Sequence, residues 1–424
     1  MYIPKKKIVV DMCIIFITCI MVLVNNTINT SKIVAIVLLM ISCVNLIRGY
    51  RNWYTFIIFG FILWCNYSIC IANLLNPIQD FFTGWRENVD VIVPAMNILL
   101  IFTSTVAVLS GEEKGEEFCK KTFWKENPHN AVSVYGTAGV LLLIMVFGFS
   151  RPEQSGARGS SSSIYEYSLI LFILAYYYTH TKIEKIILTI LLVGYVMQDL
   201  LYGGRATALQ LIICWFLIFM SHKVQQKRML PFVVLAIIIF SGIGALRANF
   251  VFNISAIKDT LQNIFSQKFT LDTAYSAFYT SGTFLKVETI VSVKDRIDLF
   301  IAFLLSMIFG GSKIKNSNLG AYTHDYYMHY YGGVLPYYAH FYLGIIGVIL
   351  IGIYVSFLIK NTCCNNKSMA NDGLIKCIRI YIVSSVPRWY LYSPSSLIRG
   401  MVIIVVIYYA YFLFDQVIKR KSIG

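Results

Sequence analysis

The chain has 424 residues, of which 57% are hydrophobic and only 13% are charged, and its mean hydropathy is +0.67. This composition excludes an ordinary soluble domain. The formal net charge of +15 does not require nucleic acid as a partner, because Lys and Arg gather in connections on one side of the predicted membrane spans.

Apolar runs of ~17–25 residues, each long enough to cross a bilayer, recur along the chain. The runs lack the alternation of barrel strands, so they predict helices. About twelve transmembrane helices are expected, at residues 8–24, 32–48, 52–72, 91–110, 131–149, 164–179, 183–200, 204–221, 230–246, 337–359, 376–392 and 400–417. We therefore predict a single all-α integral membrane domain over residues 1–424.

The first apolar run follows Lys5, Lys6 and Lys7 and so resembles a signal peptide. Because Asn25 and the residues after it offer no small-residue cleavage site, we expect a retained first span. The excess of Lys and Arg in short connections places both termini in the cytoplasm. No predicted outer connection contains a cysteine, so no disulfide framework is expected.

One long outer loop, residues 247–336, interrupts the spans and is rich in tyrosine. Residues 255–284 are expected to form an amphipathic helix or coil. The apolar segment 299–310 is too short to span and predicts a re-entrant or interfacial helix. A transporter has little use for such a loop, whereas an enzyme acting on a lipid-linked substrate needs a polar cavity covered by protein.

Five arginines lie on the predicted outer side, and each offers a planar, permanently charged fork that suits phosphate oxygens. Several together would suit a diphosphate, although each could instead anchor its helix at the interface. Anchoring is the stronger alternative for Arg151 and Arg399. Arg205 and Arg247 lie among small residues that let a ligand approach. The five are Arg151, Arg158, Arg205, Arg247 and Arg399.

A second cluster of functional residue types lies late in the outer loop. His324 is the candidate general base, because histidine exchanges protons near neutral pH, and Asp325 could fix its tautomer. The dense tyrosines suit sugar binding. Candidate substrate-binding residues are Asp325, Tyr326, Tyr327, His329 and Tyr330. His340 is expected to be structural, and the spacing of His324, Asp325 and His329 is a poor match to a metal site.

Four short motifs carry a resemblance to a known family: Gly203-Gly204-Arg205, Gly244-Ala245-Leu246-Arg247, Phe341-Tyr342-Leu343-Gly344-Ile345-Ile346-Gly347 and Trp389-Tyr390-Leu391-Tyr392-Ser393-Pro394. Together with the overall layout, they resemble bacterial polysaccharide repeat-unit polymerases of the O-antigen polymerase (Wzy) type. O-antigen ligases are more distantly similar.

The resemblance implies a GT-C-like, inverting, metal-independent glycosyltransferase without a cofactor, in the bacterial cytoplasmic membrane. Its donor and acceptor would both be undecaprenyl-diphosphate-linked oligosaccharides, and a chain-length regulator is an implied partner. Arg205 and Arg247, with Arg158, would stabilise the departing diphosphate. His324 would accept the proton of the acceptor hydroxyl, with His329 and His340 as alternatives.

Two other hypotheses about the function stay open. An O-antigen ligase shares the donor chemistry and differs only in its acceptor. A lipid-linked oligosaccharide flippase or other transporter would also have many spans with both ends inside. Transporters often show two similar halves, whereas here the connection at residues 181–183 is minimal and the outer material lies in one late loop.

Overall fold

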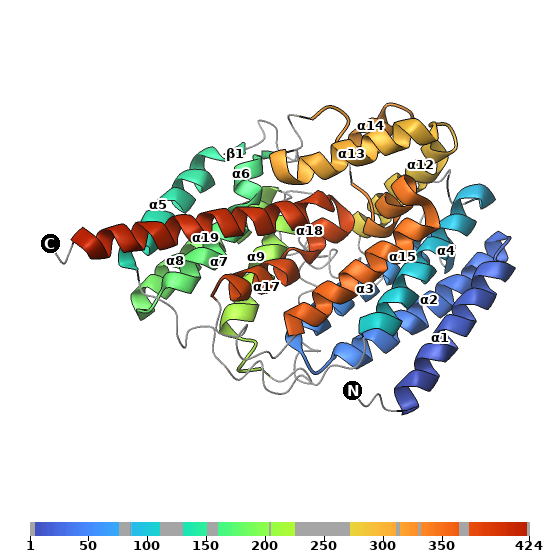
Figure 1. The fold of residues 1–424 in the computed structure, drawn as a ribbon, viewed down its shortest axis with the longest axis horizontal. Helices are drawn as coiled ribbons and strands as arrows, with labels where there is room; N and C mark the ends of the chain where they lie inside the picture. Colours follow the sequence, from blue (N-terminus) through green and yellow to red (C-terminus); the bar gives the residue numbers. More distant parts are fainter. Residues whose placement is uncertain are drawn as a thin grey trace, which may run out of the picture. The chain divides into compact units, whose positions relative to one another are not determined.

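The computed structural model describes residues 5–75, 85, 87–110, 130–150, 160–202, 205–224, 272–310, 314–329, 332–363 and 373–421. These residues are almost entirely helical (Figure 1). The exception is a two-residue antiparallel pair, in which β1 (Phe149–Ser150) pairs with β2 (Ser160–Ser161). The prediction of an all-α fold is confirmed for this part of the chain.

The helices follow the predicted apolar runs closely. Their bounds are α1 Lys5–Val24, α2 Ile28–Gly49, α3 Trp53–Cys70 with the π-helix η1 Ile71–Leu75, α4 Val89–Ser110, α5 Ala131–Phe147, α6 Ser163–Glu166, α7 Ser168–Tyr178, α8 Lys182–Tyr202, α9 Arg205–Phe219, α12 Asp272–Glu288, α13 Val293–Phe309, α14 Leu319–His324, α15 Leu335–Cys363, α17 Gly373–Ser384, α18 Val386–Leu391 and α19 Ser395–Lys421.

Six of these helices are long and apolar enough to cross a membrane: Lys7–Val24, Ile28–Gly49, Trp53–Leu75, Val89–Ser110, Leu335–Thr362 and Ser395–Leu413. Three shorter apolar helices accompany them, at Ala131–Phe147, Ser168–Tyr178 and Ala206–Phe219. The protein is thus an all-α membrane protein. The predicted run 230–246 lies outside the described residues.

The chain divides into two compact units. The first comprises Met1–Glu116, Thr270–Cys364 and Arg388–Arg399. Helix α4 is central in it and contacts α1, α2, α12 and α15. Polar side chains join its helices: the Asn66 amide donates to Ser42 and Thr103, and the Asn45 amide donates to the Thr103 carbonyl. Helix α15 packs closely on α4, because a Cβ added to Gly352 would lie 2.8 Å from Thr105.

The second unit comprises Glu117–Phe269, Asn365–Pro387 and Gly400–Gly424. Its described core is built from α5, α7, α8, α9 and α17 and is rich in tyrosine. The Tyr195 ring lies 4.9 Å from the Tyr165 ring, and its hydroxyl donates to the Leu141 carbonyl. Asp199 is buried among Tyr165, Thr207 and the backbone of Ala208.

The described part of the long loop forms three helices in the first unit. The described part of segment 255–284, expected to be amphipathic helix or coil, belongs to α12 at residues 272–288. Helix α12 contacts α3, α4 and α15, and its residues 280–285 are buried. Helix α13 begins earlier than the predicted segment, where the Ser292 hydroxyl accepts from the Asp295 amide. This side-chain cap satisfies an amide at the helix start.

Helix α15 is broken within the predicted span. Gly344 has φ 61° and ψ −151°, a backbone region essentially restricted to glycine. A Cβ on Gly347 would lie 2.2 Å from the Ala339 carbonyl oxygen, so the turn also needs a second glycine. The backbone of this turn therefore explains why the Phe341–Gly347 motif has glycine at both positions.

Candidate active site

The candidate site lies at one end of the first unit, where α12 contacts α14 and packs against α4 and α15 (Figure 1). Several contacts fix this arrangement. The Tyr337 hydroxyl donates to the Ala95 carbonyl, and the Val334 amide donates to the Ser281 hydroxyl. At the same end, the Asn25 amide donates to Asn97. In the predicted orientation this is the outer end, and it carries most of the described loop.

His329 is a buried link between two helices of the site. The residue is only 4% exposed. Nδ1 lies 3.4 Å from the Thr280 hydroxyl on α12, and Nε2 lies 3.0 Å from the Thr323 hydroxyl on α14. Because both ring nitrogens are engaged, His329 holds α14 against α12.

His324 lies beside His329, with ring centroids 5.3 Å apart. Its Nδ1 accepts a hydrogen bond from the His329 backbone amide at 3.3 Å. A neutral histidine that accepts at Nδ1 carries its proton on Nε2. In this arrangement, His324 would have to change tautomer before Nε2 could accept a proton.

Aromatic side chains from the same segments pack on one another. Trp85 lies 5.9 Å from the Tyr279 ring and 5.5 Å from the Tyr327 ring, measured between centroids. The Tyr322 and Tyr326 hydroxyls are 3.1 Å apart. Burial, followed by the contact with Tyr326, raises the pKa of Tyr322 to about 12, so the Tyr322 hydroxyl stays protonated at neutral pH. It can therefore donate to a sugar oxygen.

The remaining predicted residues are only partly brought together. Asp325 and Tyr326 are exposed beside His324. The Arg399 guanidinium donates to the Ser306 carbonyl of α13, and its Nε has no partner within the described ranges. Arg205 is the first residue of α9, in the second unit. Predicted residues outside the described part are Arg151, Arg158, Arg247 and Tyr330.

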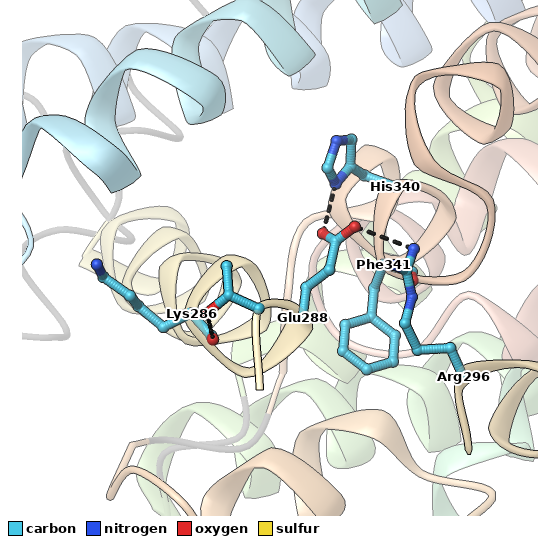
Figure 2. A network of polar contacts seen from close by, with 6 residues as sticks. Lys286, Glu288, Arg296, His340 and Phe341 are labelled. Carbon is cyan, nitrogen blue, oxygen red and sulfur yellow. Dashed lines mark hydrogen bonds and ion pairs between the residues drawn. The ribbon is translucent and has the colours of Figure 1, made fainter. Parts of the chain in front are cut away.

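A charged network links α12, α13 and α15 (Figure 2). One carboxylate oxygen of Glu288 lies 2.9 Å from the Arg296 guanidinium, and the other lies 2.9 Å from Nδ1 of His340. The side chains of all three are 17% exposed. Close by, the Lys286 ammonium lies 3.6 Å from the Asp90 carboxylate. A half-buried network of this kind holds its side chains in fixed orientations more firmly than exposed pairs do.

Arg296 also supports the break in α15. Its Nε donates to the Phe341 carbonyl at 2.6 Å. In an unbroken helix that carbonyl would accept from the amide four residues later, but Gly344 interrupts the helix before that point. The guanidinium lies 5.7 Å from the Phe341 ring centroid as well. Arg296 thus fixes the turn that carries His340.

Sequence reasoning missed Glu288, Arg296, Trp85 and Tyr279. A usable signal was the short distance along the chain between Glu288 and Arg296 at a junction of two helices. No family model, curated protein or solved structure matches this chain. Within the described ranges, no group of three or more His, Cys, Asp or Glu side chains could hold a metal ion.

Proposed function

We propose that the protein is a membrane glycosyltransferase that polymerises undecaprenyl-diphosphate-linked repeat units into a surface polysaccharide, either O-antigen or capsule. The observation that carries this proposal is the end of the first unit at which the loop helices α12 and α14 lie. There, α12 and α14 hold histidines, tyrosines and a charged network against the ends of apolar helices. This combination suits a polar sugar attached to a membrane-embedded lipid.

The proposed reaction is direct displacement at the anomeric carbon of the donor, with inversion. Arg205 and Arg247, with Arg158, neutralise the departing undecaprenyl diphosphate. Arg151, Arg399, Asp325, Tyr326, Tyr327 and Tyr330 bind the glycan and its headgroup, and His329 holds α14 in place beside them. A histidine of the site accepts the proton of the acceptor hydroxyl. Because these groups provide the charge stabilisation and proton transfer, the reaction needs neither a metal ion nor a cofactor.

In the proposed arrangement, twelve spans form a GT-C-like fold in the bacterial cytoplasmic membrane. Both termini lie in the cytoplasm, the site faces the outer side, and a chain-length regulator acts as partner. The distribution of Lys and Arg supports this orientation. So does the position of the long loop.

The decisive experiment deletes this gene and resolves the surface glycan of the strain by gel according to chain length. Single repeat units on the surface would establish a polymerase, because export and ligation would still work. Lipid-linked polymer that never reaches its final acceptor would establish a ligase. Complete loss of surface glycan, with repeats accumulating on the inner leaflet, would establish a flippase and overturn the proposal.

The arginine roles can be tested in the same strain. Arg205→Ala and Arg247→Ala should each abolish polymer while the protein remains in the membrane. Arg→Lys at either position should retain little activity, because an ammonium cannot replace the planar fork. Polymer of normal length from both alanine variants would contradict diphosphate stabilisation by these residues.

A further inference from the structure

The three histidines of the site differ in what their ring nitrogens contact. His329 is buried with both nitrogens on hydroxyls, and His324 accepts at Nδ1 from a backbone amide. His340 instead places Nδ1 2.9 Å from the Glu288 carboxylate. Figure 2 shows its second nitrogen directed away from the network, and Nε2 has no hydrogen-bond partner within the described ranges.

The Glu288 contact determines the tautomer of His340. Glu288 also faces the Arg296 guanidinium at 2.9 Å, a group that only donates hydrogen bonds. An ionised carboxylate only accepts hydrogen bonds, so Nδ1 of His340 must carry the proton. Neutral His340 therefore presents an unprotonated Nε2, which is the state required of a general base.

The position of His340 is also well supported. Arg296 holds the next residue through the Phe341 carbonyl. It also holds Glu288, which in turn holds His340. The three residues come from α12, α13 and α15, so the imidazole is fixed from two neighbouring helices. Glu288 and, through it, Arg296 are the charged groups in contact with His340.

We propose that His340 is the catalytic base of the glycosyl transfer and that Glu288 and Arg296 are its positioning residues, an assignment that rests on the proposed function. The O–H bond of the acceptor sugar breaks, and its proton passes to Nε2 of His340. The acceptor oxygen bonds to the anomeric carbon of the donor. The bond from that carbon to the phosphate oxygen breaks, and undecaprenyl diphosphate leaves with the electron pair.

The test uses the full-length protein in liposomes, with lipid-linked repeat units extracted from the strain lacking the gene. His340→Gln should lower kcat by about 10²–10⁴-fold, the usual contribution of a positioned base, with a much smaller change in KM. His222→Gln, outside the site, is the matched control and should retain the wild-type rate. His324→Gln should lose less activity than His340→Gln, and the reverse order would return the base role to His324.

A second variant separates catalysis from folding. In His340→Ala, added imidazole should restore part of the lost rate, in proportion to its unprotonated fraction as pH rises. A purely structural histidine would give no such rescue. Wild-type activity in His340→Gln, or a loss in His340→Ala that imidazole does not restore, would overturn the assignment.

Glu288→Gln tests the positioning role. Arg296 has only donors, so the glutamine oxygen must face Arg296 and its NH₂ group must face Nδ1 of His340. That contact removes the Nδ1 proton and places it on Nε2, so the base is in the wrong tautomer. We expect a lower kcat and a shifted pH profile, while Glu288→Asp restores part of the rate. An unchanged pH profile in Glu288→Gln would contradict this role. Absence of polymer with wild-type protein would instead overturn the proposed function, and this assignment with it.

Discussion

Helices α12 and α13 follow each other in one loop, and the less apolar of the two is the more deeply buried. Helix α12 is rich in Ser and Thr, yet residues 280–285 are buried. Helix α13 has the more apolar sequence, yet it buries only one line of residues, Leu299, Phe303 and Ser306. Ile301 and Ile308 remain exposed, at 49% and 63%.

The difference shows that hydropathy does not predict burial inside a membrane protein. Small residues let helices approach closely, and hydroxyl groups form hydrogen bonds between helices, so a moderately polar helix can occupy the centre of a bundle. Apolar side chains are equally stable against lipid tails, so they do not need a protein partner. Three substitutions in α12 and α13 and one at the break in α15 test how this region is packed, from the largest expected effect to the smallest.

Phe284→Ala in α12 should lower the free energy of unfolding by about 3–5 kcal/mol. Phe284 is fully buried, with its ring 4.9 Å from that of Tyr338. Phe309→Ala in α13 is the matched control, because Phe309 is 66% exposed. Unfolding of the purified protein in detergent measures both. Equal losses would show that the two helices are not packed differently.

Gly344→Ala should cost about 1–3 kcal/mol through backbone strain alone, because a Cβ at this position would meet nothing within 4 Å. Gly139→Ala in α5 is equally free of contacts, and in a regular helix alanine should be neutral or stabilising. The same unfolding measurement compares them. A neutral Gly344→Ala would mean that α15 is continuous and that Arg296 caps no break.

Ser281→Ala should cost about 1–3 kcal/mol, because the buried Val334 amide would lose its acceptor. The Ser281 hydroxyl accepts from that amide at 3.0 Å and donates to the Ala277 carbonyl at 2.8 Å. Thr289→Ala, at an exposed position just after α12, provides the control in the same thermal-unfolding assay. If the Ser281 and Thr289 variants melt together, the hydroxyls of α12 do not join the helices.

Ile301→Ala in α13 should change the free energy of unfolding in detergent by no more than about 0.5 kcal/mol. Leu299→Ala, two residues away on the buried side at 4% exposure, should cost about 2–5 kcal/mol. A large loss from Ile301→Ala would show that a further part of the protein covers this side of α13.

The sequence predicted residue types for the candidate site but not the contacts between them. The loop, its tyrosines and its histidines were evident from the sequence, and α14 holds His324 beside His329 as their spacing allows. The roles of the histidines were not evident. His340 was expected to be structural, and the sequence does not show that Glu288, 52 residues earlier, is its partner in space.

The sequence by itself determined that this is an all-α membrane protein, because helix length and side-chain polarity in lipid are local properties. It also placed the two glycines of the motif in α15. Only the tertiary structure decided that α12 is buried, that α15 breaks at Gly344, and that Glu288, Arg296 and His340 meet. Those features depend on groups from distant segments satisfying one another's hydrogen bonds, and a linear pattern does not contain that pairing.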